Sequence, residues 1–314
     1  MELEKIHILK DRSEMLAKAR EFFQKRNVCE VDCPAMSKSA SIEVHIDLYR
    51  CYGASSRTFY LHSSPEYGMK KLLAEGIGDI FQLGHVFRDN EYSMRHNPEF
   101  TMAEWYRVKV PFTAIIEETV EFIQEFIGKL PVTKISYREA FKKYAGIDYV
   151  TATEDDLLHY LEESGIDPYQ NIEEEGKDAL LNIILGVVIE PQLGKDDICV
   201  LQYFPATQAA MAKTRKRGDE EVSERFEVFH KGMELANGYH ELTDSEEQHE
   251  RLVITNNTRE RLSKDTLPID ESFIKALEKG LPDCCGVSDG FDRLMMLRHK
   301  MDDIADVIPL PERS

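Results

Sequence analysis

Cysteine is scarce and unpatterned in this chain. The six cysteines include no CxxC pair, and the neighbours Cys284 and Cys285 are poorly suited to a disulfide because adjacent residues rarely meet its geometry. Cys29 and Cys33 lack a second ligand pair at zinc-site spacing. The sequence therefore argues against a disulfide-stapled secreted protein and against a structural zinc site, and it favours reduced thiols.

Long apolar runs and positive charge are also scarce. No stretch approaches the roughly 18 uncharged apolar residues of a membrane-spanning helix, and the N-terminal stretch MELEKIHILKDRSEM lacks the apolar region of a signal peptide. Lys and Arg number 39 against 58 Asp and Glu, a net charge of −19, which repels phosphate backbones and anionic lipids. We expect a cytoplasmic protein with no membrane partner.

Internal repeats and low-complexity linkers are missing, which favours one domain. With 42% hydrophobic residues the chain can bury a sizeable core. Helical spacing of apolar residues alternates with short strand-like runs, and the acidic stretch at about 147–190 is expected to be a small helical insertion. We predict a single α+β domain over 1–314, with an antiparallel sheet flanked by helices.

Chemistry-bearing residues gather in four clusters at strand ends, where side chains are held rigidly. In the first, SSPEY, Glu66 begins a predicted helix. It could orient an amino group, or it could be an ordinary first-turn acid that favours the helix dipole.

The second cluster is the predicted hairpin FRDNEYSMRHNPEFTMAEWYR, with Arg88 at the end of one strand and Phe100 on the next. A guanidinium binds phosphate oxygens through two bonds and an aromatic face stacks on adenine, so the pair suits a nucleotide. The alternative is a hairpin whose charged residues form only surface ion pairs.

In the third cluster, Glu227, Glu234 and Glu241 recur every seven residues. Residues seven apart in an unbroken strand point to opposite faces, so only a turn or bulge near His230–Gly232 would bring Glu227 and Glu234 together. Two carboxylates beside a triphosphate would hold Mg²⁺; unpaired edge carboxylates are the alternative.

The fourth cluster, GVSDGFDR, places Arg293 at the start of a predicted helix. The arginine could reach a terminal phosphate, although a lone helical arginine is usually a surface residue.

Taken together and in this order, the clusters resemble the signatures of class II aminoacyl-tRNA synthetases of the lysyl branch. The segment ending at Pro34 resembles motif 1, the dimer element, and the hairpin and GVSDGFDRL resemble motifs 2 and 3. Only a short stretch precedes motif 1, where lysyl-tRNA synthetases carry an anticodon-binding OB-fold. The chain, with its SSPEYGMKKLL, YFPATQAA and PDCCGV phrases, is most similar to the elongation factor P–(R)-β-lysine ligases.

The resemblance implies an ATP-dependent, Mg²⁺-using homodimer that activates (R)-β-lysine and transfers it to a lysine side chain of elongation factor P, with no tRNA bound. It implies that Arg88 and Arg293 are catalytic. The implied ATP-binding residues are Arg88, Asn90, His96, Asn97, Phe100, Glu234, Leu235, Gly290 and Arg293. The implied Mg²⁺ ligands are Glu227 and Glu234. The implied amino-acid site consists of Ser64, Pro65, Glu66, Tyr106, Asn237, Glu241 and Ser288.

Two positions depart from the family pattern. Asn90 stands where motif 2 has a glutamate, and we expect its amide oxygen to accept from the adenine amino group. Ser288 stands where the synthetases have glycine and the ligases typically alanine. A side chain at 288 should narrow the site beside the amino-bearing carbon, so we expect α-lysine to be a poorer substrate than β-lysine. The neighbouring Asp289 receives no role.

Other interpretations stay open at this point. A truncated lysyl-tRNA synthetase would transfer lysine to tRNA or another acceptor, an asparagine synthetase A-like enzyme would use related chemistry, and an inactive homologue would be expected to have lost the arginines. The basic run KTRKRG at 213–218 is interpreted as a solvated loop, with docking of an acidic acceptor as the alternative.

Overall fold

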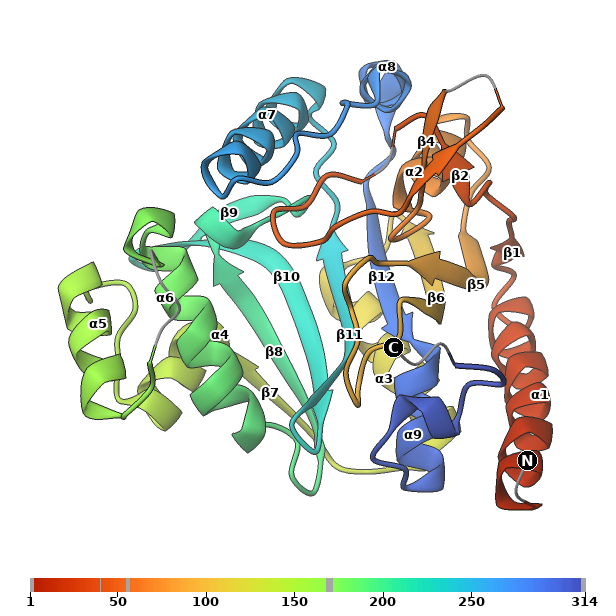
Figure 1. Ribbon diagram of the computed structural model, residues 1–314, viewed down its shortest axis with the longest axis horizontal. Helices are drawn as coiled ribbons and strands as arrows, with labels where there is room; N and C mark the ends of the chain where they lie inside the picture. Colours follow the sequence, from red (N-terminus) through yellow and green to blue (C-terminus); the bar gives the residue numbers. More distant parts are fainter. Residues whose placement is uncertain (1–2, 40, 55–56, 168–171, 312–314) are drawn as a thin grey trace. The chain divides into compact units, whose positions relative to one another are not determined.

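The computed structural model describes residues 3–39, 41–54, 57–167 and 172–311. The chain divides into two compact units, one made of Met1–Lys129 with Glu241–Ser314 and the other of Leu130–His240 (Figure 1). Both combine helices with mainly antiparallel strands, which confirms the predicted α+β class. The organisation as one domain stays a prediction.

The first unit is built on a row of hydrogen-bonded strands: β1 (Cys29–Glu30), β5 (Ile80–Phe87), β6 (Glu99–Val108) and β12 (Cys284–Gly290). β1 is parallel to β5, and the other pairs are antiparallel. β5 and β6 form the predicted long hairpin, with Ile80 opposite Tyr106 and Phe87 opposite Glu99.

Helices α1 (Leu3–Gln24) and α3 (Phe112–Ile127) cover one face of these strands, and α9 (Phe291–His299) packs against α3. Phe23 of α1 stacks on Phe81 of β5 with ring centroids 4.4 Å apart, and Phe122 of α3 lies 5.3 Å from Trp105 of β6. Because side chains alternate along a strand, the residues on either side of Trp105 point to the opposite face, away from these helices.

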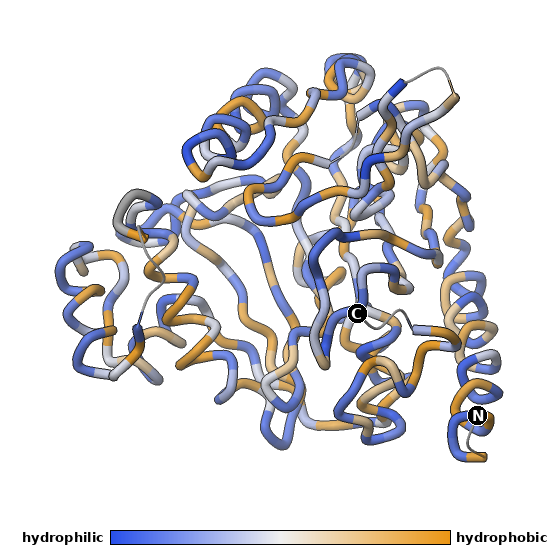
Figure 2. Tube along the Cα trace, in the orientation of Figure 1, coloured by the Kyte–Doolittle hydropathy of each residue, from blue (hydrophilic) through white to orange (hydrophobic). Residues whose placement is uncertain are grey.

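Smaller elements complete the first unit. They are the three-stranded sheet β2 (Met36–Ser37), β4 (Thr58–Leu61) and β3 (Arg50–Tyr52), and the helices α2 (Glu66–Ala74), α7 (Ser245–Arg261) and α8 (Glu271–Gly280). Tyr67 of α2 stacks on Phe273 of α8 at 4.2 Å. Figure 2 draws α7 mostly in blue, as its charged sequence predicts. Among the described residues, no helix combines the length and the apolar character that crossing a bilayer requires.

The second unit contains the strands β7 (Val132–Ser136), β8 (Ile198–Pro205), β9 (Thr214–Arg217), β10 (Glu220–His230) and β11 (Met233–His240) and the helices α4 (Tyr137–Ala140), α5 (Glu154–Glu163) and α6 (Lys177–Ile184). β10 pairs antiparallel with β8, β9 and β11. The helices bury an apolar cluster that includes Tyr137, Leu181 and Phe229. The acidic stretch at about 147–190 is thus helical over α5 and α6, while 168–171 lie outside the described residues.

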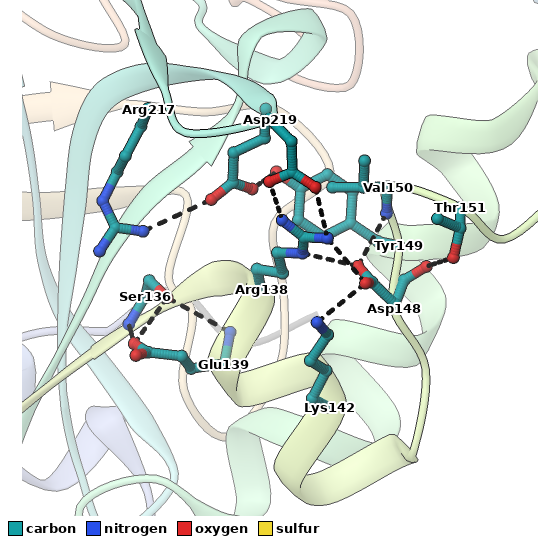
Figure 3. A network of polar contacts seen from close by, with 11 residues as sticks. Ser136, Arg138, Glu139, Lys142, Asp148, Tyr149, Val150, Thr151, Arg217 and Asp219 are labelled. Atoms are coloured by element: carbon teal, nitrogen blue, oxygen red, sulfur yellow. Dashed lines mark hydrogen bonds and ion pairs between the residues drawn. The ribbon is translucent and has the colours of Figure 1, made fainter.

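A polar network ties α4 to the turn between β9 and β10 (Figure 3). Arg138 donates to Asp148 at 2.7 Å and to Asp219 at 2.6 Å, and Tyr149 donates to Glu220 at 2.7 Å. Ser136 and Glu139 form a capping box at the start of α4.

The prediction that KTRKRG is a loop was wrong. Residues 214–217 form β9, where Lys216 lies opposite Glu221 and Arg217 opposite Glu220. Opposite charges across an antiparallel pair stabilise the pairing, which explains why the run is a strand. Arg215 lies opposite Val222 but pairs with Glu224 at 3.1 Å, so the cations of β9 are accompanied by glutamates of β10.

Candidate active site

Polar side chains converge where α2 begins, on the face of the first unit's sheet opposite α1 and α3. Ser64 Oγ accepts from the backbone N–H of Glu66 at 3.0 Å and donates to Glu104 Oε2 at 2.7 Å. Pro65, the N-cap residue of α2, has a φ of −74°, which suits the start of a helix. Ser64 and Pro65 therefore present Glu66 to the strand that carries Glu104.

Lys70 lies one helical turn after Glu66 and is almost completely buried, with 1% of its side chain exposed. Its Nζ is 2.6 Å from Glu66 Oε1 and 2.5 Å from Glu241 Oε2. Glu241 follows β11 and is held by its backbone N–H, which donates to the carbonyl of Cys284. The structure thus brings Glu66 and Glu241 together through a lysine that sequence reasoning left without a role.

Glu104 and Tyr106 lie on the same face of β6, two residues apart, and the Tyr106 hydroxyl donates to Glu104 Oε1 at 2.8 Å. Burial and the nearby charges of Glu66 and Glu241 raise the pKa of Glu104 to about 8, although the hydrogen bonds from Ser64 and Tyr106 oppose the shift. Burial and the Glu104 charge also raise the pKa of Tyr106 well above its usual value. Together the residues form an acidic cluster (Glu66, Lys70, Glu104, Tyr106 and Glu241) in which one more cation would be stabilised.

The glycine at 286 allows Glu241 and Tyr106 to approach the backbone of β12. Gly286 lies opposite Tyr106 in the ladder, and a Cβ at this position would be 2.5 Å from Glu241 Oε1 and 2.6 Å from Tyr106 Cδ1. No side chain fits at these distances, so position 286 must be glycine for Glu241 and Tyr106 to lie this close to β12. Ser288 lies opposite Glu104 and therefore shares the face of the acidic cluster, at its partly exposed edge.

Arginines gather around His96 in the hairpin between β5 and β6. Burial and the positive charges of Arg293, Arg88 and Arg95 lower the pKa of His96 to about 4, so the ring is neutral at pH 7. A guanidinium only donates, hence His96 Nε2 accepts from Arg293 at 2.8 Å and the ring proton lies on Nδ1, which donates to Ser93 at 2.7 Å. A cation cluster that keeps a histidine neutral is a favourable environment for an anion.

Arg88 stacks its guanidinium over the ring of Phe100 at 5.1 Å, and it lies 3.7 Å from Glu91. Its Nε is buried and has no hydrogen-bond acceptor among the residues that the structure describes. A buried donor that lacks an acceptor is costly, so an anion supplied by a ligand would satisfy it. The predicted nucleotide residues Arg88, His96, Phe100 and Arg293 are thus brought together.

Asn90 and Asn97 differ in their surroundings. Asn90 is exposed with a φ of 62°, a left-handed conformation that asparagine tolerates better than glutamate. This accounts for the departure at position 90 in physical terms. Asn97 is buried, and its Nδ2 donates to the carbonyl of Glu99 at 2.6 Å, so its amide stabilises the hairpin itself.

The start of α9 is held in place by contacts with α1 and β6. Gly290 is its N-cap, where an added Cβ would lie 3.5 Å from Arg293 Cδ. The buried carboxylate of Asp292 is hydrogen-bonded to Arg12 of α1 and accepts from the backbone N–H of Thr101 at 2.7 Å. The residue next to Arg293 is therefore held by both α1 and β6.

The remaining predicted site residues belong to the second unit. A hairpin turn at Lys231 and Gly232, with φ of 52° and 64°, joins β10 to β11 as the sequence predicts. Val228 pairs with Ala236 and Phe229 with Glu234, so the ladder contains a bulge at Leu235, which is buried. Turn and bulge together place Glu234 on the face of Glu227.

Glu227 lies opposite Asn237, whose Nδ2 is 3.4 Å from Glu227 Oε1, and it is paired with Arg225 at 2.5 Å. Burial and the charges of Glu234 and Glu190 raise the pKa of Glu227 to about 8, against the opposing effect of Arg225. A buried carboxylate whose pKa is raised by a neighbouring carboxylate fits a cation, and Mg²⁺ needs only one or two protein oxygens besides phosphate and water. No group of three or more His, Cys, Asp or Glu with metal-ligand geometry occurs within the described part of the chain.

Sequence reasoning missed Lys70, Arg12 and Arg225 and assigned no role to Glu104. Two signals were available: Lys70 is four residues after Glu66 on a helix, and Glu104 is two residues before Tyr106 on a strand. The contacts of Lys70 with Glu241 and of Arg12 with Asp292 join segments far apart in the chain, which spacing does not reveal.

Comparison with known proteins shows the family of the chain. The family model described as tRNA synthetases class II (D, K and N) matches residues 2–314. The chain is 40% identical over 302 residues to the elongation factor P–(R)-β-lysine ligase of Haemophilus influenzae, covering 95% of this chain and 92% of that protein. Enzymes with the same name from Avibacterium paragallinarum and Yersinia enterocolitica are 40% and 39% identical, covering 96% of this chain and 94% and 93% of theirs.

Class II synthetase-like enzymes are ligases that use ATP. The family match spans nearly the whole chain. The chain therefore belongs to the class II tRNA synthetase family and, within it, to the elongation factor P–(R)-β-lysine ligases.

Proposed function

We propose that this enzyme activates (R)-β-lysine with ATP as an adenylate and transfers it to a lysine side chain of elongation factor P. The observation that carries the proposal is the charge of the acidic cluster. Glu66, Glu104 and Glu241 supply three carboxyl groups and Lys70 one ammonium, which gives an excess of two negative charges once Glu104 is ionised. A lysine isomer brings two ammonium groups, and a buried ammonium needs a carboxylate if desolvation is not to cancel its binding.

Within this site we assign the amine near the carboxyl end of the substrate to Glu66 and Glu104, and the far ammonium to Glu241 with the Tyr106 hydroxyl. The resemblance assigns Asn237 of the second unit to the substrate carboxylate. Ser288 would lie beside the amino-bearing carbon and disfavour α-lysine. These roles rest on the resemblance and on the chemistry of each side chain.

For ATP, we assign the α-phosphate to Arg88, the γ-phosphate to Arg293 and the adenine ring to Phe100. In the free protein Phe100 carries the Arg88 guanidinium on its face, so adenine would compete with or extend that stack. Asn90, His96, Asn97, Leu235 and Gly290 would line the nucleotide. Neutral His96 orients Arg293 without adding charge.

Mg²⁺ would be held by Glu227 and Glu234, where it would offset negative charge on the phosphates. Arg225 pairs with Glu227 in the free protein and fixes the orientation of that carboxylate.

The reaction has two steps. A carboxylate oxygen of the substrate attacks the α-phosphorus, the bond to the β-phosphate oxygen breaks, and pyrophosphate leaves; Arg88 and Arg293 stabilise the developing charge. The lysine amine of the acceptor, having lost its proton, then attacks the carbonyl carbon of the anhydride, an amide bond forms, and AMP leaves.

We also propose a cytoplasmic homodimer that uses a protein acceptor rather than tRNA. Leu3 and Ile6 of α1 are exposed apolar residues on the helix that resembles the dimer element. Light scattering of the purified protein tests the dimer, since a monomer at micromolar concentration would exclude it.

Pyrophosphate exchange with (R)-β-lysine and α-lysine in parallel tests the first step, and mass spectrometry of elongation factor P tests the second. We expect exchange with (R)-β-lysine and a lysyl-type mass increase on the acceptor. Charging of tRNA together with an unmodified acceptor would instead support the truncated lysyl-tRNA synthetase.

A further inference from the structure

Lys70 occupies an unusual place in the acidic cluster. Its ammonium bridges Glu66 and Glu241 at 2.6 and 2.5 Å, and these are the two carboxylates to which the proposed function assigns the two amines of the substrate. The protein therefore already holds one ammonium of its own between the two groups that bind ammonium.

This is not an ordinary helix ion pair. Exposed pairs four residues apart contribute little to stability, but here the side chains of Lys70 and Glu241 are each 1% exposed and that of Glu66 is 14% exposed. Burial alone would lower the pKa of Lys70, whereas the charges of Glu241 and Glu66 raise it above its usual value. Lys70 is thus a permanent cation at this position.

We propose that Lys70 is a positioning and specificity residue: an internal counter-ion that orients Glu66 and Glu241 and offsets one negative charge of the site. The inference rests on the proposed amino-acid site and adds a residue to it. Without the ammonium, Glu66 and Glu241 would be like charges in a buried site, and one of them would turn away or take up a proton. Either change removes an acceptor for the substrate's amines and leaves the nucleotide residues untouched.

The test is amine rescue of Lys70→Ala, read by pyrophosphate exchange with (R)-β-lysine. The truncation removes Cγ, Cδ, Cε and Nζ, the skeleton of n-propylamine. We expect KM for the diamino acid to rise by more than about tenfold while KM for ATP changes less than about twofold, and n-propylammonium to restore much of the loss. Isosteric n-propanol, which carries no charge, should restore little.

Lys71→Ala is the matched control. Lys71 is the next residue of α2 and pairs outside the acidic cluster, with Asp270 at 2.6 Å and Ser272 at 2.8 Å. The Lys71→Ala variant should keep KM for the diamino acid and KM for ATP near those of the unmodified enzyme, and n-propylammonium should not activate it. Unmodified enzyme with added n-propylammonium shows whether the amine competes with substrate.

The outcomes separate the two proposals. If the unmodified enzyme performs no exchange with either isomer, the proposed function fails. If it is active but Lys70→Ala keeps its KM for the diamino acid, or n-propanol rescues as well as the amine, the positioning role is overturned. Should Lys70→Ala fail to fold, Lys70→Arg is the second test. The displaced charge should raise KM for the diamino acid and leave KM for ATP unchanged. An unchanged ratio of KM for the diamino acid to KM for ATP would refute the proposal.

Discussion

Arg12 of α1 is hydrogen-bonded to Asp292, the residue that precedes Arg293 in α9. Both side chains are buried, at 8% and 3% exposure, and Arg12 also donates to Thr101 Oγ1 at 2.8 Å. The helix that resembles the dimer element thus contacts the residue beside the arginine assigned to the γ-phosphate.

Arg12→Met should lower the free energy of unfolding by about 3–5 kcal/mol, because it leaves a buried carboxylate without its cation. Arg20→Met on the same helix is the control, since the Arg20–Glu30 pair is exposed and should contribute about 0–1 kcal/mol. Urea denaturation measures both. Equal losses would show that Arg12 and Asp292 are not a buried pair. If Arg12→Met folds, KM for ATP should rise as well.

Gly286→Ala should abolish most activity with the diamino acid, because its Cβ would overlap Glu241 and Tyr106. Overpacking of this kind costs about 1–3 kcal/mol. Gly84→Ala is the matched strand control, since the atom nearest to its Cβ is 3.7 Å away. Pyrophosphate exchange measures the activity of both variants. Full activity of Gly286→Ala would contradict the packing of Glu241 and Tyr106 against position 286.

Binding of the diamino acid at pH 7 should release up to about one proton. The pKa of Glu104 is about 8 in the free protein, so the carboxyl is mostly protonated, and an arriving ammonium favours the ionised form. Affinity should therefore increase as the pH rises from 6 to 8. Calorimetry in buffers of different ionisation heat measures the proton, and Glu104→Gln should abolish its release. A heat that does not depend on the buffer would contradict this role.

Ser288→Gly should improve the use of α-lysine relative to (R)-β-lysine by about tenfold, an amount typical of one or two small groups in a binding site. The serine side chain lies on the Glu104 face of β12, beside the carbon that we assign to the amine. Ser288→Ala keeps a Cβ and should retain most of the discrimination. Exchange rates with both isomers decide, and an unchanged preference in Ser288→Gly would count against the assignment.

Local patterns predicted much of the fold. The β5–β6 hairpin was predicted from two strand-like runs joined by a polar stretch. The β10–β11 turn was predicted because only a turn or bulge brings Glu227 and Glu234 to the same face. In each case the deciding interactions lie within a few residues along the chain, so sequence spacing is sufficient.

What could not be predicted depends on distant segments. Glu241 and Lys70 meet only because the C-terminal part of the first unit returns to α2, and β9 is a strand because Glu220 and Glu221 lie opposite its cations. Tertiary partners of this kind override local propensity. The spacing of Glu104 to Tyr106 is a local signal, but the contact of Glu104 with Ser64 depends on the three-dimensional arrangement.

The most direct test is ATP–pyrophosphate exchange by the purified enzyme with Mg²⁺ and each lysine isomer alone. The account predicts exchange that depends on added (R)-β-lysine and is clearly weaker with α-lysine. No exchange with either isomer, in protein that is folded and binds ATP, would contradict the claim that the acidic cluster holds the two amines of a substrate about to be adenylated.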